Sequence, residues 1–423
     1  MGLAATESDL LREILSISRL LVVTTDLDAL LTRIAHAACK IIECDRATIY
    51  LHDAKTHELW SRVAIGADEI RFPADLGIAG HVFTANKLLH VSDPYADPRF
   101  NPDPDRRSGF ITRNLLTVPL VDIDRKPLGV LQAVNTTDED FSESDQKMIQ
   151  MLADQAGVAI QRYHLQQTAI EAAELKRELQ LARDVQLALL PEAPPEIAGI
   201  ECIGWSRPAG ITGGDIYDLW QMRDGSLGIF VGDAMGHGLA PTLMVSQVRT
   251  VLRSLCDIES DPMKLLRLLN ERFADDFASG KFATTFFGTL RGDGLLKWSS
   301  AGHGPSIVCP DLAQPPELIE ANGIPLGILD HDYTAINVHP ISLQPGGWLA
   351  IISDGIHEAL NANGQYFGID RTLELLLPLS TDSLCTVLSR LQAAVTEWQG
   401  VELPQDDQTV VFIRRSKDPR STP

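Results

Sequence analysis

The sequence is poor in cysteine and contains no long apolar run. Six cysteines are scattered along 423 residues without a Cys-x-x-Cys pair, which predicts small buried thiols in a reducing compartment. None is followed by five residues and then an arginine, so the phosphatase loop with a cysteine nucleophile is excluded. No apolar run approaches the about 18 residues of a membrane span, and the first residues carry acids where a secretory signal carries bases. We therefore expect a cytoplasmic protein without a membrane partner.

Basic residues are also few relative to acidic ones. The sequence has 36 Lys and Arg against 57 Asp and Glu, a net charge of −21. Such a surface repels nucleic acid, so we expect no nucleic-acid partner. Hydrophobic residues make up 44% and charged residues 22%, which is a globular composition. A chain of 423 residues is long enough for two or three domains.

Three regions differ in their residue patterns, and together they predict an α+β protein. Residues 1–160 mix helical and strand patterns, residues 161–191 form a segment without glycine and with proline only at its end, and residues 192–415 are rich in strands and glycine turns. A short tail, 416–423, follows. In the first region the patterns predict one helix over Leu10–Leu21 and another over 26–42, and antiparallel strands at 47–53, 58–65, 115–122 and 129–135.

The segment 161–191 predicts a coiled-coil linker helix. Spacings of three and four place eight residues on one seam: Leu165, Thr168, Ala172, Leu175, Leu179, Ala182, Gln186 and Leu189. We favour a parallel homodimer, because a helix between two globular domains has little else on which to bury this seam. The polar members Thr168 and Gln186 would keep the coil weak. The alternative is one amphipathic helix that packs on its own domain.

In the third region, several aspartates lie at the ends of predicted strands. Asp233 and Asp354 each follow an apolar run, Asp406 with Asp407 precedes one, and Asp215 lies between a Gly-Gly turn and a strand. Rigid elements that bring several carboxylates together suit a hard cation, Mg²⁺ or Mn²⁺. Taken singly, each of these residues is better explained as a turn residue than as a ligand, because Asp-Gly is a common turn dipeptide.

Eight strings of the third region resemble one family. ELQLARDVQLALLP, GGDIYD, VGDAMGHG, FATTFFGTL, SSAGHGPSIV, GIPLGI, IISDGIHEA and DDQTVV are similar, in this order, to the bacterial SpoIIE/RsbU-type branch of the PPM family of metal-dependent serine/threonine phosphatases. The resemblance implies an α-β-β-α sandwich, a centre of two Mn²⁺ or Mg²⁺ ions, and an activated water that attacks a phosphoserine or phosphothreonine. The implied substrate is a regulatory protein such as an anti-sigma-factor antagonist. The alternative is a catalytically inactive or weak domain that serves as a signal-dependent binding module.

The resemblance assigns roles to particular residues. It implies that Asp233 bridges both metals, that the carbonyl of Ala234 serves the second metal, and that Asp354 and Asp406 complete the centre. It implies that Asp215 binds a metal ion either directly or through a water molecule. Whether Asp406 or Asp407 is the ligand depends on register alone, and we prefer Asp406. Gly236 to Gly238 should form the turn into a helix over 239–255, which helps to complete the site in this family. We interpret His237 and His303 as turn or core residues, and Asp218 has no assigned role. His357 and Pro241 depart from the family pattern, which has Thr and Ala at these positions.

The first region resembles a GAF domain, a small antiparallel sheet flanked by helices. The strings that carry this resemblance are DLGIAGHVFTANK, VSDPYADPRFNPDPDRRSGFITRNLLTVPLVD and GVLQAVNTTDEDFSESDQ. Asn135, Phe141 and Asp145 match a signature of phosphodiesterase GAF domains, whereas Thr136 and Gln146 depart from it. The resemblance implies a pocket near Asp97, Arg99, Phe100 and Thr112, with a cyclic nucleotide as the candidate ligand. The alternative is an empty GAF domain that only dimerises or binds a partner.

Overall fold

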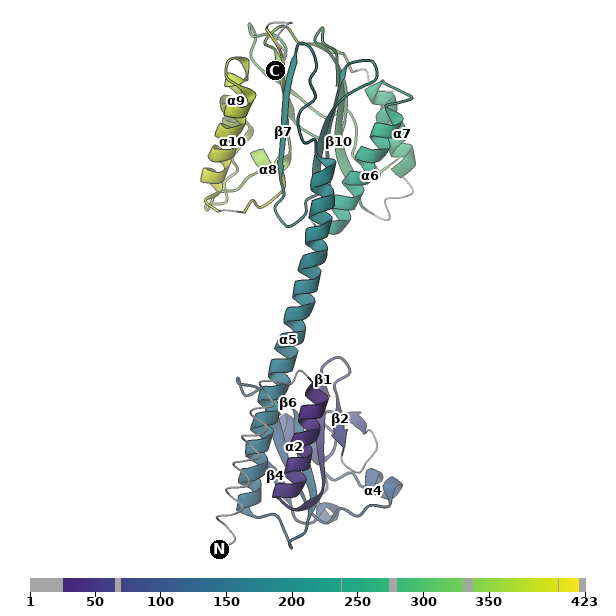
Figure 1. The fold of residues 1–423 in the computed structure, drawn as a ribbon, viewed down its shortest axis with the longest axis vertical. Coiled ribbons are helices and arrows are strands. Elements are labelled where there is room, and N and C mark those ends of the chain that lie inside the picture. The colour runs from purple at the N-terminus through teal and green to yellow at the C-terminus, as the bar shows by residue number, and fades with distance from the viewer. Residues whose placement is uncertain are drawn as a thin grey trace. The chain divides into compact units, whose positions relative to one another are not determined.

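The chain folds into two compact units. The structure is a computed structural model that describes residues 26–64, 70–236, 238–273, 280–329, 333, 338–401 and 403–417. One unit comprises Met1–Ala173 and the other Glu174–Pro423. The helix predicted over Leu10–Leu21 and the turn residue His237 lie outside the described residues. The ribbon of each unit is shown in Figure 1.

Unit 1 is built on a six-stranded antiparallel sheet with the order β3-β2-β1-β6-β5-β4. Its strands are β1 (Cys44–Asp53), β2 (Glu58–Ala64), β3 (Arg71–Pro73), β4 (Leu89–Val91), β5 (Leu115–Val121) and β6 (Pro127–Thr136). Helix α2 (Leu27–Ile41) and the first turns of α5 (Glu143–Leu189) pack on one face, and α3 (Gly77–Ala85) packs on the other. Two short elements, η1 (Pro94–Ala96) and α4 (Asp103–Ser108), lie between β4 and β5.

Unit 2 contains two five-stranded antiparallel sheets. One has the order β14-β11-β10-β9-β8 and the other β13-β12-β15-β16-β7. The strands of the first are β8 (Asp215–Gln221), β9 (Leu227–Ala234), β10 (Ala283–Leu290), β11 (Leu295–Ala301) and β14 (Ile341–Ser342). Those of the second are β7 (Ile200–Arg207), β12 (Ser306–Cys309), β13 (Glu317–Ile319), β15 (Trp348–Ile352) and β16 (Gln408–Arg415).

Helices cover the outer faces of these sheets, so unit 2 has four layers. Buried side chains of both sheets, such as Val231 and Val411, form one core between them. Helices α6 (Leu239–Leu255) and α7 (Pro262–Phe273) bury their apolar sides on the first sheet. Helices α9 (Ile369–Leu376) and α10 (Leu384–Gln399) cover the second, with α8 (Asp354–His357) and η3 (Leu377–Ser380) beside them. The two helix pairs lie on opposite sides of the sheets in Figure 1.

Most predicted elements are present. The predicted strands of the first region correspond to β1, β2, β5 and β6, and the helices predicted at 26–42 and 239–255 are α2 and α6. The α+β class, with antiparallel sheets in both units, is confirmed. The segment predicted as a linker helix lies within α5, one helix of 47 residues that begins at Glu143, and its residues from Glu174 onward group with unit 2. The coiled coil itself stays a prediction. Across the described part of the chain, no helix has the length and apolar character needed to cross a membrane.

Candidate active site

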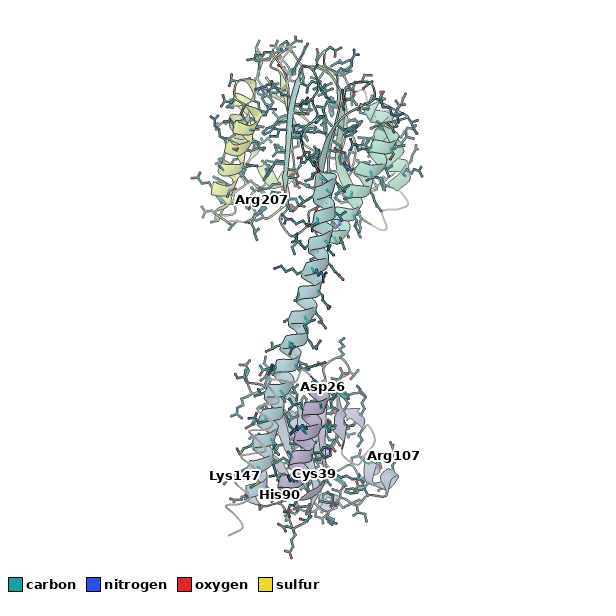
Figure 2. All side chains as sticks on the ribbon, viewed as in Figure 1. Asp26, Cys39, His90, Arg107, Lys147 and Arg207 are labelled. Atoms are coloured by element: carbon teal, nitrogen blue, oxygen red, sulfur yellow. The ribbon has the colours of Figure 1, made fainter. Side chains whose placement is uncertain are left out.

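The predicted carboxylates lie at strand ends along one edge of unit 2. Asp215 is the first residue of β8 and stands directly opposite Asp233, near the end of β9. In an antiparallel pair, directly opposed side chains lie on the same face of the sheet. Asp354 opens α8 immediately after β15, and Asp406 lies just before β16. Arg207, the last residue of the neighbouring strand β7, is labelled in Figure 2.

Glycines in the motifs allow the backbone to close around this edge. A Cβ atom on Gly214 would lie 2.5 Å from the carbonyl oxygen of Ala234, and one on Gly355 would lie 2.1 Å from the carbonyl oxygen of Asp407. Neither distance is compatible with a side chain, so only glycine fits at these positions. The carbonyl of Ala234, the predicted backbone ligand, is therefore held at the turn that precedes Asp215.

Asp406 and Asp407 have different environments. The carboxylate of Asp407 is buried and accepts hydrogen bonds from the backbone amides of Ala209, at 2.7 Å, and of Gly214. Asp406 is exposed, and one of its oxygens accepts a 2.8 Å bond from the amide of Asp407. Asp407 is thus hydrogen-bonded to the turn before β8, whereas Asp406 faces solution. This arrangement favours Asp406 as the residue open to a ligand.

The carboxylates of the edge raise one another's pKa values. Burial raises the pKa of Asp233 to about 7, with further contributions from Asp354, Asp406 and Asp407. Burial and the charges of Asp233 and Asp407 raise the pKa of Asp215 well above its usual range. The pKa of Asp354 is raised by burial and then by Asp406. Carboxylates that disfavour one another's ionisation in this way need a compensating cation or proton.

The donors at this edge fit a hard cation. Oδ2 of Asp215 is buried and finds no hydrogen-bond donor among the described residues. The available oxygens come from carboxylates and from the carbonyl of Ala234, and such oxygens suit Mg²⁺ or Mn²⁺. Within the described ranges, no three Asp, Glu, His or Cys side chains are grouped tightly enough to enclose an ion as they stand. A cation would have to draw together side chains that repel one another in its absence.

Sequence reasoning missed the role of Gln186 at this edge. We expected Gln186 and Leu189 on the coiled-coil seam, but Gln186 is 7% exposed and its side-chain nitrogen donates to the carbonyl of Gly213 at 2.9 Å. Leu189 packs against the core beneath α6 and α7. Both seam assignments are therefore wrong, because the end of α5 is buried on unit 2. The string ELQLARDVQLALLP was the available signal, since it is one of the eight strings that resemble the family and it contains both residues.

Two further motif residues, Asp218 and His303, have structural contacts in unit 2. Asp218, buried in β8, forms ion pairs with Arg249 at 2.8 Å and Arg253 at 3.5 Å and so connects β8 to α6. His303 is buried, as predicted for a core residue, and its Nδ1 lies 3.0 Å from the hydroxyl of Thr284. Burial lowers the pKa of His303 to about 4, with a contribution from His357.

Each of the four predicted GAF pocket residues has a contact partner within unit 1. Arg99 and Asp97 form an ion pair with N–O distances of 2.6 and 2.9 Å, which lowers the pKa of Asp97 to about 2. Phe100 contacts the ring of Tyr95 at a centroid distance of 5.2 Å. The amide of Thr112 donates to Asp105 at 2.8 Å. The ligand pocket predicted from these four residues stays a prediction.

The matched GAF signature residues have structural contacts. The side chain of Asn135 accepts from the amide of Arg113 at 2.7 Å and donates to the carbonyl of Ile111 at 2.9 Å, so it clasps the segment before β5. Phe141 is buried in the core. Asp145 accepts from the amide of Ser142 at 2.8 Å at the start of α5. These contacts account for the three matches without a ligand.

One open cavity of about 450 Å³ lies elsewhere in unit 1. It is lined by residues at the start of α2, by one residue of β2 and by residues in the middle of α5; Asp26, one of the lining residues, is labelled in Figure 2. Its lining residues are Asp26, Leu27, Asp28, Arg62, Tyr163, Gln166, Gln167 and Ile170. None of the four predicted pocket residues contributes to it.

Comparisons with known proteins agree with both resemblances. The family model for stage II sporulation protein E (SpoIIE) matches residues 223–416, and the GAF domain model matches residues 26–160. The phosphoserine phosphatase RsbU of Bacillus subtilis (strain 168) is 27% identical over 248 residues, which are 57% of this chain and 71% of that protein. A probable 3′,5′-cyclic phosphodiesterase of Caenorhabditis elegans, pde-5, is 30% identical over 148 residues, which are 32% of this chain and 20% of that protein.

A solved structure supports the fold of the second unit. The SiaA-PP2C domain of Pseudomonas aeruginosa superposes with a TM-score of 0.50 and 20% identity, and the match covers 58% of this chain and 99% of that domain. At this identity the likeness concerns the fold alone. The chain spans only about a fifth of the length of the phosphodiesterase that it matches.

Proposed function

Because residues 223–416 belong to the SpoIIE family of PPM-type phosphatase domains and residues 26–160 to the GAF family, we propose that the chain is a metal-dependent protein phosphatase under the control of its GAF domain. The observation that carries this proposal is the strand edge at which Asp215 faces Asp233 and at which Asp354 and Asp406 raise the pKa of Asp233. The PPM family is metal-dependent in general, and this edge supplies the oxygen donors that such a centre requires.

Each residue of the edge has a proposed role as a ligand of such a centre. Asp233 would be shared by two Mn²⁺ or Mg²⁺ ions, with Asp354, Asp406 and the carbonyl of Ala234 as further ligands and Asp215 as a direct or water-mediated one. Two bound ions would supply an activated water and neutralise charge on the phosphoryl group. The chain's own part is to hold the backbone that carries these oxygens on strand ends and tight turns, so that the carboxylate side chains move, and not the strands, when the ions bind.

We propose a phosphoserine or phosphothreonine residue of a regulatory protein as the substrate. The support is the similarity to a phosphoserine phosphatase over 57% of the chain. An anti-sigma-factor antagonist is the candidate that the family resemblance suggests. Hydrolysis through an activated water needs no nucleophilic side chain, which is consistent with a sequence in which no cysteine is followed by five residues and then an arginine.

The GAF unit is the proposed sensor, and a cyclic nucleotide is its candidate ligand. The similarity to a cyclic phosphodiesterase over 148 residues supports this candidate. Isothermal titration of the full-length chain with cAMP and cGMP should give a saturable heat with at least one of them. The Arg99→Ala variant should weaken it, because the ion pair with Asp97 would be lost. Absence of heat with both nucleotides would leave the empty, partner-binding GAF domain as the better description.

The catalytic proposal is tested by one substitution with a matched control. Asp233→Asn removes the charge at the shared ligand position, so hydrolysis of p-nitrophenyl phosphate with Mn²⁺ should fall roughly 100-fold or more while the circular dichroism spectrum is kept. Asp224→Asn alters an exposed carboxylate in the turn of the same β8–β9 hairpin and should leave the rate unchanged. A folded Asp233→Asn protein with the wild-type rate would contradict the metal assignment.

The inactive binding module predicts a different result. In that case the wild-type chain would bind a phosphoprotein but would show no Mn²⁺-dependent hydrolysis at any metal concentration. All four strand-end carboxylates are present at one edge, and this favours the active enzyme.

A further inference from the structure

The last turns of α5 are bonded to the turn that precedes Asp215. The side-chain nitrogen of Gln186 donates to the carbonyl oxygens of Gly213, at 2.9 Å, and Asp215, at 3.2 Å. The amide of Gly213 in turn donates to the side-chain oxygen of Gln186 at 3.2 Å. Both ends of one buried side-chain amide are therefore used on a single three-residue turn.

The same turn is held from two other sides. The hydroxyl of Thr242 in α6 donates to the carbonyl of Gly213 at 2.7 Å, so Gln186 and Thr242 share one acceptor. The carboxylate of Asp407 accepts from the amides of Gly214 and Asp215. No side chain can replace Gly214, because its Cβ would meet the carbonyl of Ala234. Small shifts of this turn therefore change the position of both Asp215 and the Ala234 carbonyl.

The anchoring of α5 does not itself require a glutamine. Leu189 and Leu190 already pack against the core of unit 2, and they attach the end of the helix by apolar contact. A buried amide that contacts only the turn adds orientation to this attachment, since hydrogen bonds are directional. Groups that orient metal ligands from behind typically change metal affinity roughly 10-fold to 100-fold when they are removed.

We propose that Gln186 is a positioning residue for Asp215, and that the last turns of α5 are part of the metal site. This inference rests on the proposed function, because it concerns the affinity of the same edge for a divalent cation. The SpoIIE family match begins at residue 223 and therefore includes neither Gln186 nor the turn that it holds. Gln186 touches no substrate atom, and it acts through the backbone of residues 213–215.

The experiment measures Mn²⁺ binding by isothermal titration on the full-length chain, together with the unfolding midpoint and p-nitrophenyl phosphate kinetics. Gln186→Leu removes the amide, and Gln186→Glu places a carboxylate against two carbonyl oxygens. Both should weaken Mn²⁺ binding roughly tenfold or more and raise the Mn²⁺ concentration needed for half-maximal rate. Gln180→Leu, on an exposed face of the same helix, removes only an i, i+4 contact with Asp184 and should leave Mn²⁺ affinity unchanged.

Thr242 provides a second set of variants in case the Gln186 variants do not fold. Thr242→Val removes the shared bond to Gly213 and should weaken Mn²⁺ binding in the same direction, whereas Thr242→Ser keeps the hydroxyl and should restore it. A purely structural role for these residues would lower the unfolding midpoint without changing the Mn²⁺ dissociation constant of the folded protein, and that result would overturn the proposal. If the wild-type chain neither binds Mn²⁺ nor hydrolyses the substrate, the proposed function fails and this inference fails with it.

Discussion

Asp407 accepts a 2.7 Å hydrogen bond from the backbone amide of Ala209, across 198 positions of sequence. The bond joins the start of β16 in one sheet to the turn that leads into β8 in the other. Asp407 also accepts from the amide of Gly214 in that turn. Its neighbour Asp406 is exposed at the carboxylate edge. The two adjacent aspartates therefore have different environments, which supports a structural role for Asp407 and the proposed ligand role for Asp406.

This division predicts opposite effects of two neighbouring substitutions. Asp406→Asn should reduce Mn²⁺ affinity and activity while the unfolding free energy changes by less than about 1 kcal/mol, because an exposed residue contributes little to stability. Asp407→Asn should cost about 2 kcal/mol or more, since its amide nitrogen would face backbone donors. Denaturant unfolding and Mn²⁺ titration of both variants check this. A stable, inactive Asp407→Asn protein beside an active Asp406→Asn protein would reverse the assignment.

The ion pair between Asp218 and Arg249 predicts a large effect on stability. The carboxylate is buried, and the guanidinium Nε lies 2.8 Å from it. Removal of one partner leaves an uncompensated buried charge, so Asp218→Ala should lower the unfolding free energy by about 3–5 kcal/mol. Asp257→Ala breaks an exposed pair with Arg223 and should cost less than about 1 kcal/mol. Equal losses in chemical denaturation would show that the buried pair contributes nothing special.

His303 predicts a dependence of stability on pH. The pKa of His303 is lowered from 6.5 to about 4 by burial, so the unfolded chain binds this proton at a higher pH than the folded one. The stabilisation is therefore fully present above pH 6.5 and is lost as the pH falls toward 4. A shift of this size corresponds to about 3 kcal/mol.

The variant His303→Gln isolates this contribution. Glutamine keeps a hydrogen-bonding group for the hydroxyl of Thr284 but does not titrate. Between pH 7 and pH 4, wild type should lose about 3 kcal/mol more unfolding free energy than the variant, because the carboxylates titrate equally in both proteins. Parallel pH profiles of the two proteins in urea unfolding would contradict the buried, neutral state of His303.

The positions of the site carboxylates could be predicted from the sequence, whereas the contacts that hold the turn before Asp215 could not. Asp215, Asp233, Asp354 and Asp406 were all predicted at strand ends, because apolar runs followed by Gly turns are local patterns. The contacts of Gln186 and Asp407 were not predictable in this way. They depend on residues 27 and 198 positions away, and periodicity carries no information about such partners.

The same limit explains the error in the linker. The spacing of Gln186 and Leu189 is equally compatible with a coiled-coil seam and with a helix end buried on a domain. The structure selects the second description for these two residues. In the GAF unit, similarly, Asn135 matched a signature by identity, but the identity alone could not distinguish a residue that clasps the backbone from one that faces a ligand.

The seam residues that precede Gln186, from Leu165 to Ala182, still predict a homodimer. Leu165 is 66% exposed and Leu175 is 58% exposed, and all described side chains from 167 to 178 are exposed. An isolated helix with exposed leucines at seam spacing gains stability when a second copy buries them, by about 1.5–3 kcal/mol for each fully buried leucine. We therefore expect a parallel dimer through this part of α5, with Leu179 at the end of the contact.

Two glutamates on the seam should separate the dimer. In the double variant Leu175→Glu, Leu179→Glu, each chain would bury two carboxylates opposite those of its partner, and like charges at a coiled-coil core are strongly unfavourable. Light scattering should give about twice the chain mass for wild type and the mass of one chain for the variant, with a changed rate of hydrolysis although no ligand of the metal site is altered. Leu181→Glu changes an equally exposed leucine off the seam and should leave mass and rate as they are. A monomeric wild type with full activity, or a double variant that matches wild type in both mass and rate, would show that the seam has no partner.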